Sequence, residues 1–218
     1  GIKFQNFRNK KKSIKIKNYL KSLLKKDNSI LQSLRNNYRD NFNFKIINKL
    51  KNIKNLRIVG MGGSSLGAKA IYYFLKDKIK KNFLFFNDLD VGIRNNKKKG
   101  YLNLIISKSG ETIETITNTN ILINKSDQNI FITENKKNYL SDLAYKLRAE
   151  VVHHNNFIGG RYSVLSETGM LPAELMGLNS KKFRQLNNLI KNKRYLDSLI
   201  SNVNSILFFM KRKKFNSI

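Results

Sequence analysis

Hydroxyl side chains crowd around one lysine in the stretch SKSGET, which begins at Ser107 and directly follows the apolar run NLII. Ser107, Ser109 and Thr112 supply three hydroxyls in six positions, and a helical pattern resumes immediately afterwards. Hydroxyls and backbone N–H groups at the start of a helix can hold a phosphate monoester without a strong cation. A helix cap needs only one hydroxyl, such as that of Ser109, so the stretch favours a phosphate site over a simple cap.

A second stretch, GMGGSSLG at residues 60–67, follows a strand candidate and opens a helical pattern. Glycines such as Gly62 and Gly63 allow backbone N–H groups to approach a ligand closely. The stretch is neither the dinucleotide fingerprint GxGxxG nor a P-loop, since no Gly-Lys-Ser/Thr occurs. Taken alone, it is explained equally well by a tight turn that binds nothing.

A third stretch, GGRYS, places Arg161 behind Gly159 and Gly160, just past another strand candidate. The two glycines free the backbone to turn, so that the guanidinium can reach the same end of the sheet. An arginine there could stabilise negative charge that develops on a substrate oxygen. A surface ion pair is the simpler explanation when the arginine is considered by itself.

The elements that would position these stretches are short apolar runs alternating with helical patterns. The strand candidates are residues 56–60, 83–88, 101–107, 129–133 and 150–154, and helices are expected at 66–77, 114–123 and 139–149. This alternation predicts an α/β fold, a doubly wound parallel sheet of about five strands with helices on both faces. In such sheets ligands bind beyond the carboxyl ends of the strands, which is where the first two stretches fall and which the guanidinium of the third can reach.

The same pattern divides the chain into three parts. Residues 1–54 form a helical segment, residues 55–170 the sheet domain, and residues 171–218 a helical tail that starts a second domain. The acidic residues Glu167 and Glu174 fall in helical patterns, and His153 and His154 end a strand. We interpret all four as structural, and without an acidic cluster beside the histidines we expect no metal site.

The amino-acid composition limits the kinds of partner that we expect for this chain. The 218 residues include 43 Lys and Arg against 14 Asp and Glu, a formal net charge of +29. The basic residues are scattered amid a general excess of Lys, Asn and Ile that biased coding would produce, so we expect no nucleic-acid partner. No apolar run approaches the ~20 residues of a membrane span, and no secretory signal or cysteine occurs. We therefore expect a cytoplasmic protein without a membrane partner.

Together, GMGGSSLG, SKSGETIET and GGRYSVLSETG resemble, in this order and at these separations, the motifs of the glucose-6-phosphate isomerase (phosphoglucose isomerase) family. That family carries G-I-G-G-S-x-L-G, S-K-T-x-T-T-x-E-T and G-G-R-x-S-x-x-S. The resemblance runs from about Arg57 to Gly169, and the third motif makes it specific. The first two motifs alone would indicate only a sugar isomerase (SIS) domain, and S-G-E-T in place of T-x-T-T is closer to that general pattern.

The resemblance implies an SIS-type domain that binds a hexose 6-phosphate and needs no cofactor. By position, the residues that would hold the phosphate are Ser64, Ser107, Lys108, Ser109 and Thr112. Gly62, Gly63 and Gly160 would shape the loop backbone. Arg161 would be the catalytic arginine that steadies the enediolate formed as a proton moves between C1 and C2. The full-length enzyme would be a homodimer.

The family's remaining chemical groups are missing from these residues. Its carboxylate base lies in a segment E-S-x-G-K and its ring-opening histidine in G-T-x-x-Q-H, and neither segment occurs here. We therefore interpret the chain as the N-terminal part of a glucose-6-phosphate isomerase, or as a reduced relative. Two alternatives stay open: a non-catalytic SIS module that binds phosphosugars, and a dual-specificity phosphoglucose/phosphomannose isomerase, whose second motif also reads S-G-x-T.

Overall fold

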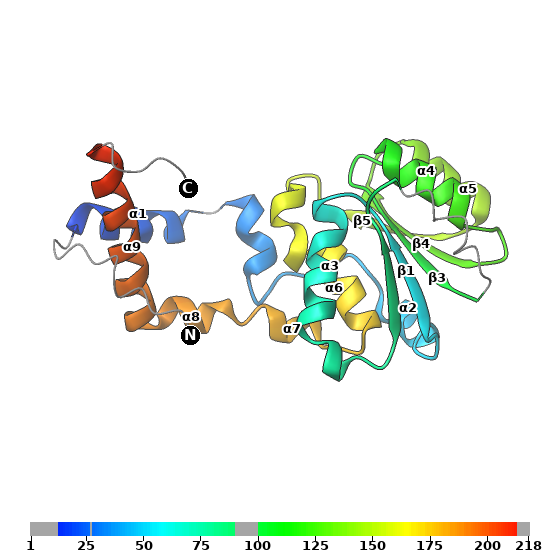
Figure 1. Ribbon diagram of the computed structural model, residues 1–218, viewed down its shortest axis with the longest axis horizontal. Coiled ribbons are helices and arrows are strands. Elements are labelled where there is room, and N and C mark those ends of the chain that lie inside the picture. The colour runs from blue at the N-terminus through cyan, green and yellow to red at the C-terminus, as the bar shows by residue number, and fades with distance from the viewer. Residues whose placement is uncertain (1–12, 27, 90–99, 213–218) are drawn as a thin grey trace. The chain divides into compact units, whose positions relative to one another are not determined.

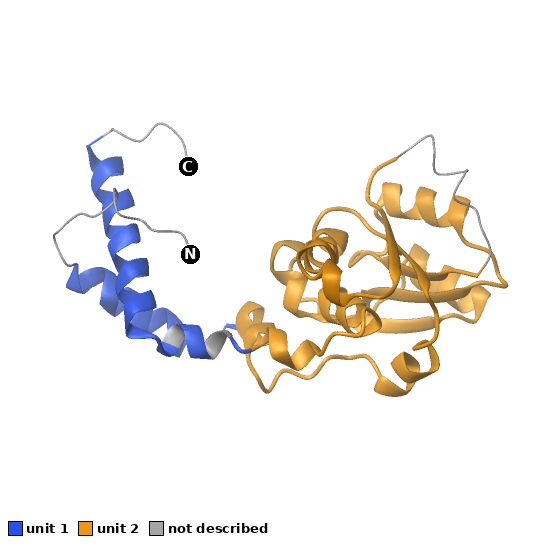
Figure 2. Ribbon diagram, turned by 60° about the horizontal axis from the view of Figure 1, so that its bottom comes forward, with its two compact units in different colours: residues 1–28, 185–218 blue, residues 29–184 orange. Residues whose placement is uncertain are grey.

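The computed structural model describes residues 13–26, 28–89 and 100–212 and divides into two compact units (Figure 2). The larger unit comprises residues 29–184, and the smaller comprises residues 1–28 and 185–218. The smaller unit holds α1 (Ile14–Lys25), α8 (Leu186–Lys191) and α9 (Lys193–Lys211). Within the described ranges, no helix is long and apolar enough to span a membrane.

The larger unit is built on five parallel strands in the order β2-β1-β3-β4-β5 (Figure 1). The strands are β1 (Asn55–Val59), β2 (Asn82–Phe86), β3 (Leu102–Ile106), β4 (Gln128–Glu134) and β5 (Glu150–His154). Each lies on one of the predicted apolar runs, because a parallel strand buried on both faces needs no polar alternation. The predicted parallel sheet of about five strands is confirmed.

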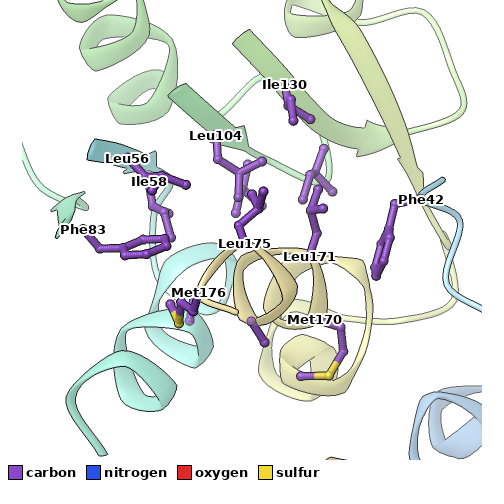
Figure 3. Close-up of a cluster of buried hydrophobic side chains, with 14 of the residues drawn as sticks. Phe42, Leu56, Ile58, Phe83, Leu104, Ile130, Met170, Leu171, Leu175 and Met176 are labelled. Carbon is purple, nitrogen blue, oxygen red and sulfur yellow. The ribbon is translucent and has the colours of Figure 1, made fainter. Parts of the chain in front are cut away.

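Helices cover both faces of this sheet (Figure 1). One face carries α3 (Gly63–Phe74) and α6 (Glu167–Leu175), and the other carries α4 (Ile113–Leu122) and α5 (Tyr139–Leu147). Successive side chains of a strand point to opposite faces of the sheet, so that Leu104 belongs to the core on the first face and Ile105 to the core on the second. Figure 3 shows Leu171 and Leu175 of α6 pointing from the helix towards the strands in the first core.

Short elements complete the unit. They are α2 (Phe44–Lys49), α7 (Ser180–Phe183), and the 3-10 turns η2 (Ser29–Leu34), η3 (Lys76–Lys78) and η5 (Gly160–Leu165). Phe42 before β1, and Leu171 and Met176 after β5, belong to the same core cluster as the strands (Figure 3). Leu50, also before β1, belongs to this cluster as well. The compact unit therefore extends past residues 54 and 170, the boundaries that the sequence suggests for the sheet domain.

The strand order creates a switch point between β1 and β3. The chain leaves β1 through α3 on one face, whereas it leaves β3 through α4 on the opposite face. The two loops therefore diverge from neighbouring strands, and in sheets of this class ligands bind beyond the carboxyl ends of the strands at such a point. The first and second polar stretches are these two loops.

Candidate functional site

The second loop draws its hydroxyls together. The Ser107 hydroxyl lies 3.0 Å from that of Thr112 and 3.5 Å from that of Ser109. Ser107 also accepts a hydrogen bond from Gly110 N at 3.2 Å, and Ser109 accepts one from Glu111 N at 3.3 Å. The N–H groups of Gly110 and Glu111 are thus hydrogen-bonded within the loop.

The N-terminus of α4 departs from the simple capped helix. Thr112, and not Ser109, is the N-cap residue of α4, and its side chain makes no capping hydrogen bond. The Thr112 hydroxyl instead faces Ser107. The first-turn N–H groups of a helix have no intrahelical partner, so an uncapped start leaves them available to an anion.

Lys108 has both its side chain and its carbonyl engaged. Its ammonium donates to the Asn156 carbonyl, which lies after β5. Its own carbonyl accepts from Glu134 N at 3.0 Å and from the Thr133 hydroxyl at 3.2 Å. The lysine therefore ties the second loop to β4 and to the segment that precedes Arg161.

The first loop needs glycine for two different reasons. Gly62 has φ +54°, a conformation that side chains disfavour, and it is the N-cap residue of α3. Gly63 lies against another backbone, since a Cβ there would be 2.2 Å from Gly160 O. Ser64, next in the chain, is half-buried, and its hydroxyl has no hydrogen-bond partner among the described residues.

The third stretch forms η5, which packs on α3. The Ser163 hydroxyl lies 2.7 Å from Gly160 O and 3.2 Å from Gly63 O, so it can donate to either carbonyl. Gly67 of α3 is in close contact with Val164, where a Cβ would lie 2.8 Å from Val164 Cγ2. Arg161 is exposed and has neither an ion pair nor a hydrogen bond within the described part of the chain.

All three stretches therefore lie at the carboxyl edge of the sheet. Gly63 joins the first stretch to the third through its contact with Gly160, and Lys108 joins the second to the segment that precedes the third through Asn156. The first and second follow adjacent strands, and a Cβ at Gly60 would lie 2.8 Å from Ile106 O. The structure thus brings the predicted residues to one edge of the sheet.

A buried polar cluster that no sequence motif indicates lies behind this edge. Glu167, which is fully buried, accepts from the Tyr38 hydroxyl at 2.9 Å and from Asn41 N at 3.2 Å through one oxygen. Its other oxygen lies 3.3 Å from His154 Nδ1, and His154 Nε2 lies 3.1 Å from Ile158 O. Burial and then the charge of Glu167 raise the pKa of Tyr38. No local pattern could reveal these contacts, since Tyr38 and Glu167 are 129 positions apart.

A second buried pair holds the same region. The Arg184 guanidinium binds the Asp40 carboxylate in a bidentate geometry, at 2.8 and 2.5 Å, and donates to Leu165 O at 2.8 Å. It also lies 5.0 Å from the centre of the Tyr38 ring. Burial raises the pKa of Asp40, and the guanidinium acts in the opposite direction.

Neither a metal-binding cluster nor a hollow in the described structure points to a different location for the candidate site. The described residues contain no cluster of three or more His, Cys, Asp or Glu side chains that could hold a metal ion. A hollow of about 770 Å³ lies near the amino ends of β1 and β2, and none of the predicted site residues lines it.

The part of the chain that carries the three stretches is similar to known proteins. The family model described as Phosphoglucose isomerase matches residues 43–204. The Glucose-6-phosphate isomerase of Acholeplasma laidlawii is 32% identical over 182 residues, which cover 70% of this chain and 43% of that protein. The enzyme of the same name from Mycoplasma genitalium is 32% identical over 191 residues, 73% of this chain and 44% of its own. The chain thus spans less than half the length of these relatives.

Solved structures share the fold at low identity. A hypothetical protein from Thermus thermophilus has a TM-score of 0.61 at 18% identity and covers 81% of this chain and 48% of its own. Tagatose-6-phosphate ketose/aldose isomerase from Escherichia coli has a TM-score of 0.52 at 16% identity, covering 67% and 45%. The predicted SIS-type α/β fold is confirmed.

Proposed function

Because the chain belongs to the phosphoglucose isomerase family, we propose that it supplies the phosphate-binding part of a glucose-6-phosphate isomerase and binds a hexose 6-phosphate. The observation that carries this proposal is the meeting of three motif segments at one sheet edge. In particular, the backbone of Gly63 touches that of Gly160, next to Arg161. Separate segments gathered at a topological switch point are the usual construction of a ligand site in this fold class.

The phosphate would bind where the second loop turns into α4. Ser107, Ser109 and Thr112 offer hydroxyls, and the first turn of α4 offers N–H groups and the positive end of its dipole. Lys108 would act mainly through its tether to Asn156, because its ammonium is already hydrogen-bonded there. Ser64, whose hydroxyl is unbonded among the described residues, would approach the same phosphate from the first loop.

Arg161 would act on the reacting end of the sugar. Moving a proton between C1 and C2 passes through an enediolate, whose oxygens carry negative charge. A guanidinium held at that position would stabilise this charge, while binding energy from the remote phosphate positions the two carbons. The proton transfer itself needs a carboxylate base, and the chain's motifs supply none. The full-length enzyme would act as a homodimer without a cofactor.

The double variant Ser109→Ala with Thr112→Ala tests the phosphate site. We expect affinity for glucose 6-phosphate and fructose 6-phosphate to fall at least tenfold, about 1.4 kcal/mol, in titration calorimetry. The free energy of unfolding should change much less, because the hydrogen bonds lost are partly exposed. Thr117→Ala, one turn further along α4, is the matched control and should bind normally. Unchanged affinity in the double variant would count decisively against the proposed phosphate site.

Activity assays separate the isomerase from the alternatives. Glucose 6-phosphate and mannose 6-phosphate should be tested on this chain and on a longer chain that continues past Ile218. Isomerisation of glucose 6-phosphate alone supports the proposal, and isomerisation of both sugars supports the dual-specificity enzyme. Binding without isomerisation by either chain would support a non-catalytic phosphosugar module.

A further inference from the structure

The buried cluster behind the sheet edge contacts the backbone on the approach to Arg161. His154 ends β5, and five residues separate it from Gly160. The Ile158 carbonyl, within those five residues, accepts from His154 Nε2. Asn155 donates to the Tyr38 hydroxyl at 2.7 Å, and that hydroxyl in turn donates to Glu167. Two points of the approach segment are therefore fixed by side chains that meet at Glu167.

Glu167 is the centre of this cluster. Its two oxygens take three partners: Tyr38, Asn41 and His154. It is fully buried at the first residue of α6, so it cannot exchange these partners for water. The segment that Glu167 holds also offers Asn156 O to Lys108. The cluster therefore supports the backbone next to Arg161 and, through Lys108, the phosphate loop.

From these contacts we propose that Glu167 is a positioning residue of the candidate site, which holds residues 155–160 and thereby sets the place of Arg161. The inference rests on the proposed function only for its effect on ligand binding. Its structural part, the ordering of the segment by Glu167, stands on the contacts alone.

The proton count of the cluster predicts which substitutions preserve it. A carbonyl can only accept, so His154 Nε2 carries a proton. Glu167 Oε1 accepts from two donors, and one further proton lies between Oε2 and His154 Nδ1. A glutamine at position 167 keeps every bond, since its carbonyl replaces Oε1 and its NH2 donates to Nδ1 of a neutral imidazole. An alanine loses all three.

Amide hydrogen exchange tests the ordering without any ligand. Ile158 N donates to Asn155 O, and Tyr162 N donates to Gly159 O, so both amides report on the segment. In Glu167→Ala we expect both to exchange at least tenfold faster, whereas the N–H of Ile123, the C-cap residue of α4, which is bonded to Thr119 O, changes less than threefold. Glu167→Gln should stay within threefold of the unmodified chain. Unchanged rates at Ile158 and Tyr162, or equal acceleration at Ile123, would overturn the proposal.

Tyr38→Phe provides a milder second variant if Glu167→Ala does not fold. It removes only the hydroxyl shared by Glu167 and Asn155. The same local pattern should appear, with exchange at Ile158 at least threefold faster and Ile123 unaffected. A uniform change along the chain would show a purely structural role and overturn the proposal.

A double-mutant cycle tests the link to Arg161. Glu167→Ala should weaken hexose 6-phosphate binding at least tenfold in the unmodified chain, and by a clearly smaller factor in Arg161→Ala, where only the effect through Asn156 and Lys108 remains. Fully additive losses would mean that Glu167 does not act through Arg161, which would overturn the positioning role. If the unmodified chain binds no hexose 6-phosphate, the proposed function fails, and the exchange rates alone decide whether Glu167 orders the segment.

Discussion

The contact between Gly63 and Gly160 predicts that alanine at Gly63 lowers stability and ligand affinity, whereas alanine at a neighbouring glycine of the third motif does not. In Gly63→Ala the new Cβ would lie 2.2 Å from Gly160 O and 2.4 Å from Gly160 C, both backbone atoms. Ordinary contact begins at 3.4 Å, so the two backbones must separate by about 1 Å. Neither can rotate away as a side chain would, because each belongs to a helical turn.

The expected magnitude combines two opposing effects. Alanine favours a helix over glycine by up to about 1 kcal/mol, and Gly63 is the first residue of α3. Overpacking a close contact costs about 1–3 kcal/mol, so the free energy of unfolding should fall by about 1–2 kcal/mol. A displacement near 1 Å at a site that depends on geometry can cost on the order of a hundredfold, so hexose 6-phosphate affinity should fall at least tenfold.

Gly159→Ala is the matched control. Gly159 has φ −75°, and a Cβ there would meet nothing within 4 Å. Alanine should therefore be neutral or stabilise by about 0.4–1 kcal/mol through the unfolded state. Urea denaturation and titration calorimetry on both variants provide the comparison. If Gly63→Ala matches the unmodified chain in both measurements, the close approach of the loops has no consequence, and the reasoning fails.

Two further predictions concern the buried cluster. Arg184→Ala should lower the free energy of unfolding by about 3–5 kcal/mol in urea, since it leaves the buried Asp40 carboxylate unpaired. Lys136→Ala, which breaks the pair between the exposed Lys136 and the half-buried Glu134, should cost less than about 1 kcal/mol, and equal losses in the two variants would contradict the prediction. An unfolded tyrosine ionises at about pH 10, whereas the raised pKa of Tyr38 keeps its hydroxyl protonated in the native chain above this pH. The contribution of Tyr38 to the free energy of unfolding is therefore complete below about pH 10 and declines at higher pH. Tyr38→Phe should reduce this alkaline decline while costing about 1–3 kcal/mol at pH 7, and an unchanged slope between pH 9 and 11 would refute it.

The fold was predictable because its signals are local. Runs such as LNLII are apolar at nearly every position, and a parallel strand covered on both faces has this composition. The predicted helix at 114–123 lies one residue from the observed α4, Ile113–Leu122. The three motif segments were predictable in the same way, since each follows a strand directly and each depends on glycines or hydroxyls within a few positions.

The cluster around Glu167 was not predictable, because its partners come from distant parts of the chain. Nothing near Tyr38 in the sequence marks it as a partner of Glu167, and nothing near Arg184 marks it as a partner of Asp40. Interpreting Glu167 as structural agrees with its burial, although the sequence gives no indication that it meets His154. Contacts of this kind follow from how α6 and the segment before β1 pack on the sheet.

Arg161 is proposed as the catalytic arginine because of its location and not because it lacks a partner. With 43 Lys and Arg against 14 Asp and Glu, most basic side chains of this chain must lack a carboxylate, so an unpaired arginine is expected anywhere on its surface. What distinguishes Arg161 is the backbone that carries it, which lies against Gly63 on one side and follows a segment held by His154 and Lys108 on the other. A side chain needed only for solubility requires no such support. The role proposed for Arg161, which places a guanidinium against a developing charge, would require this support.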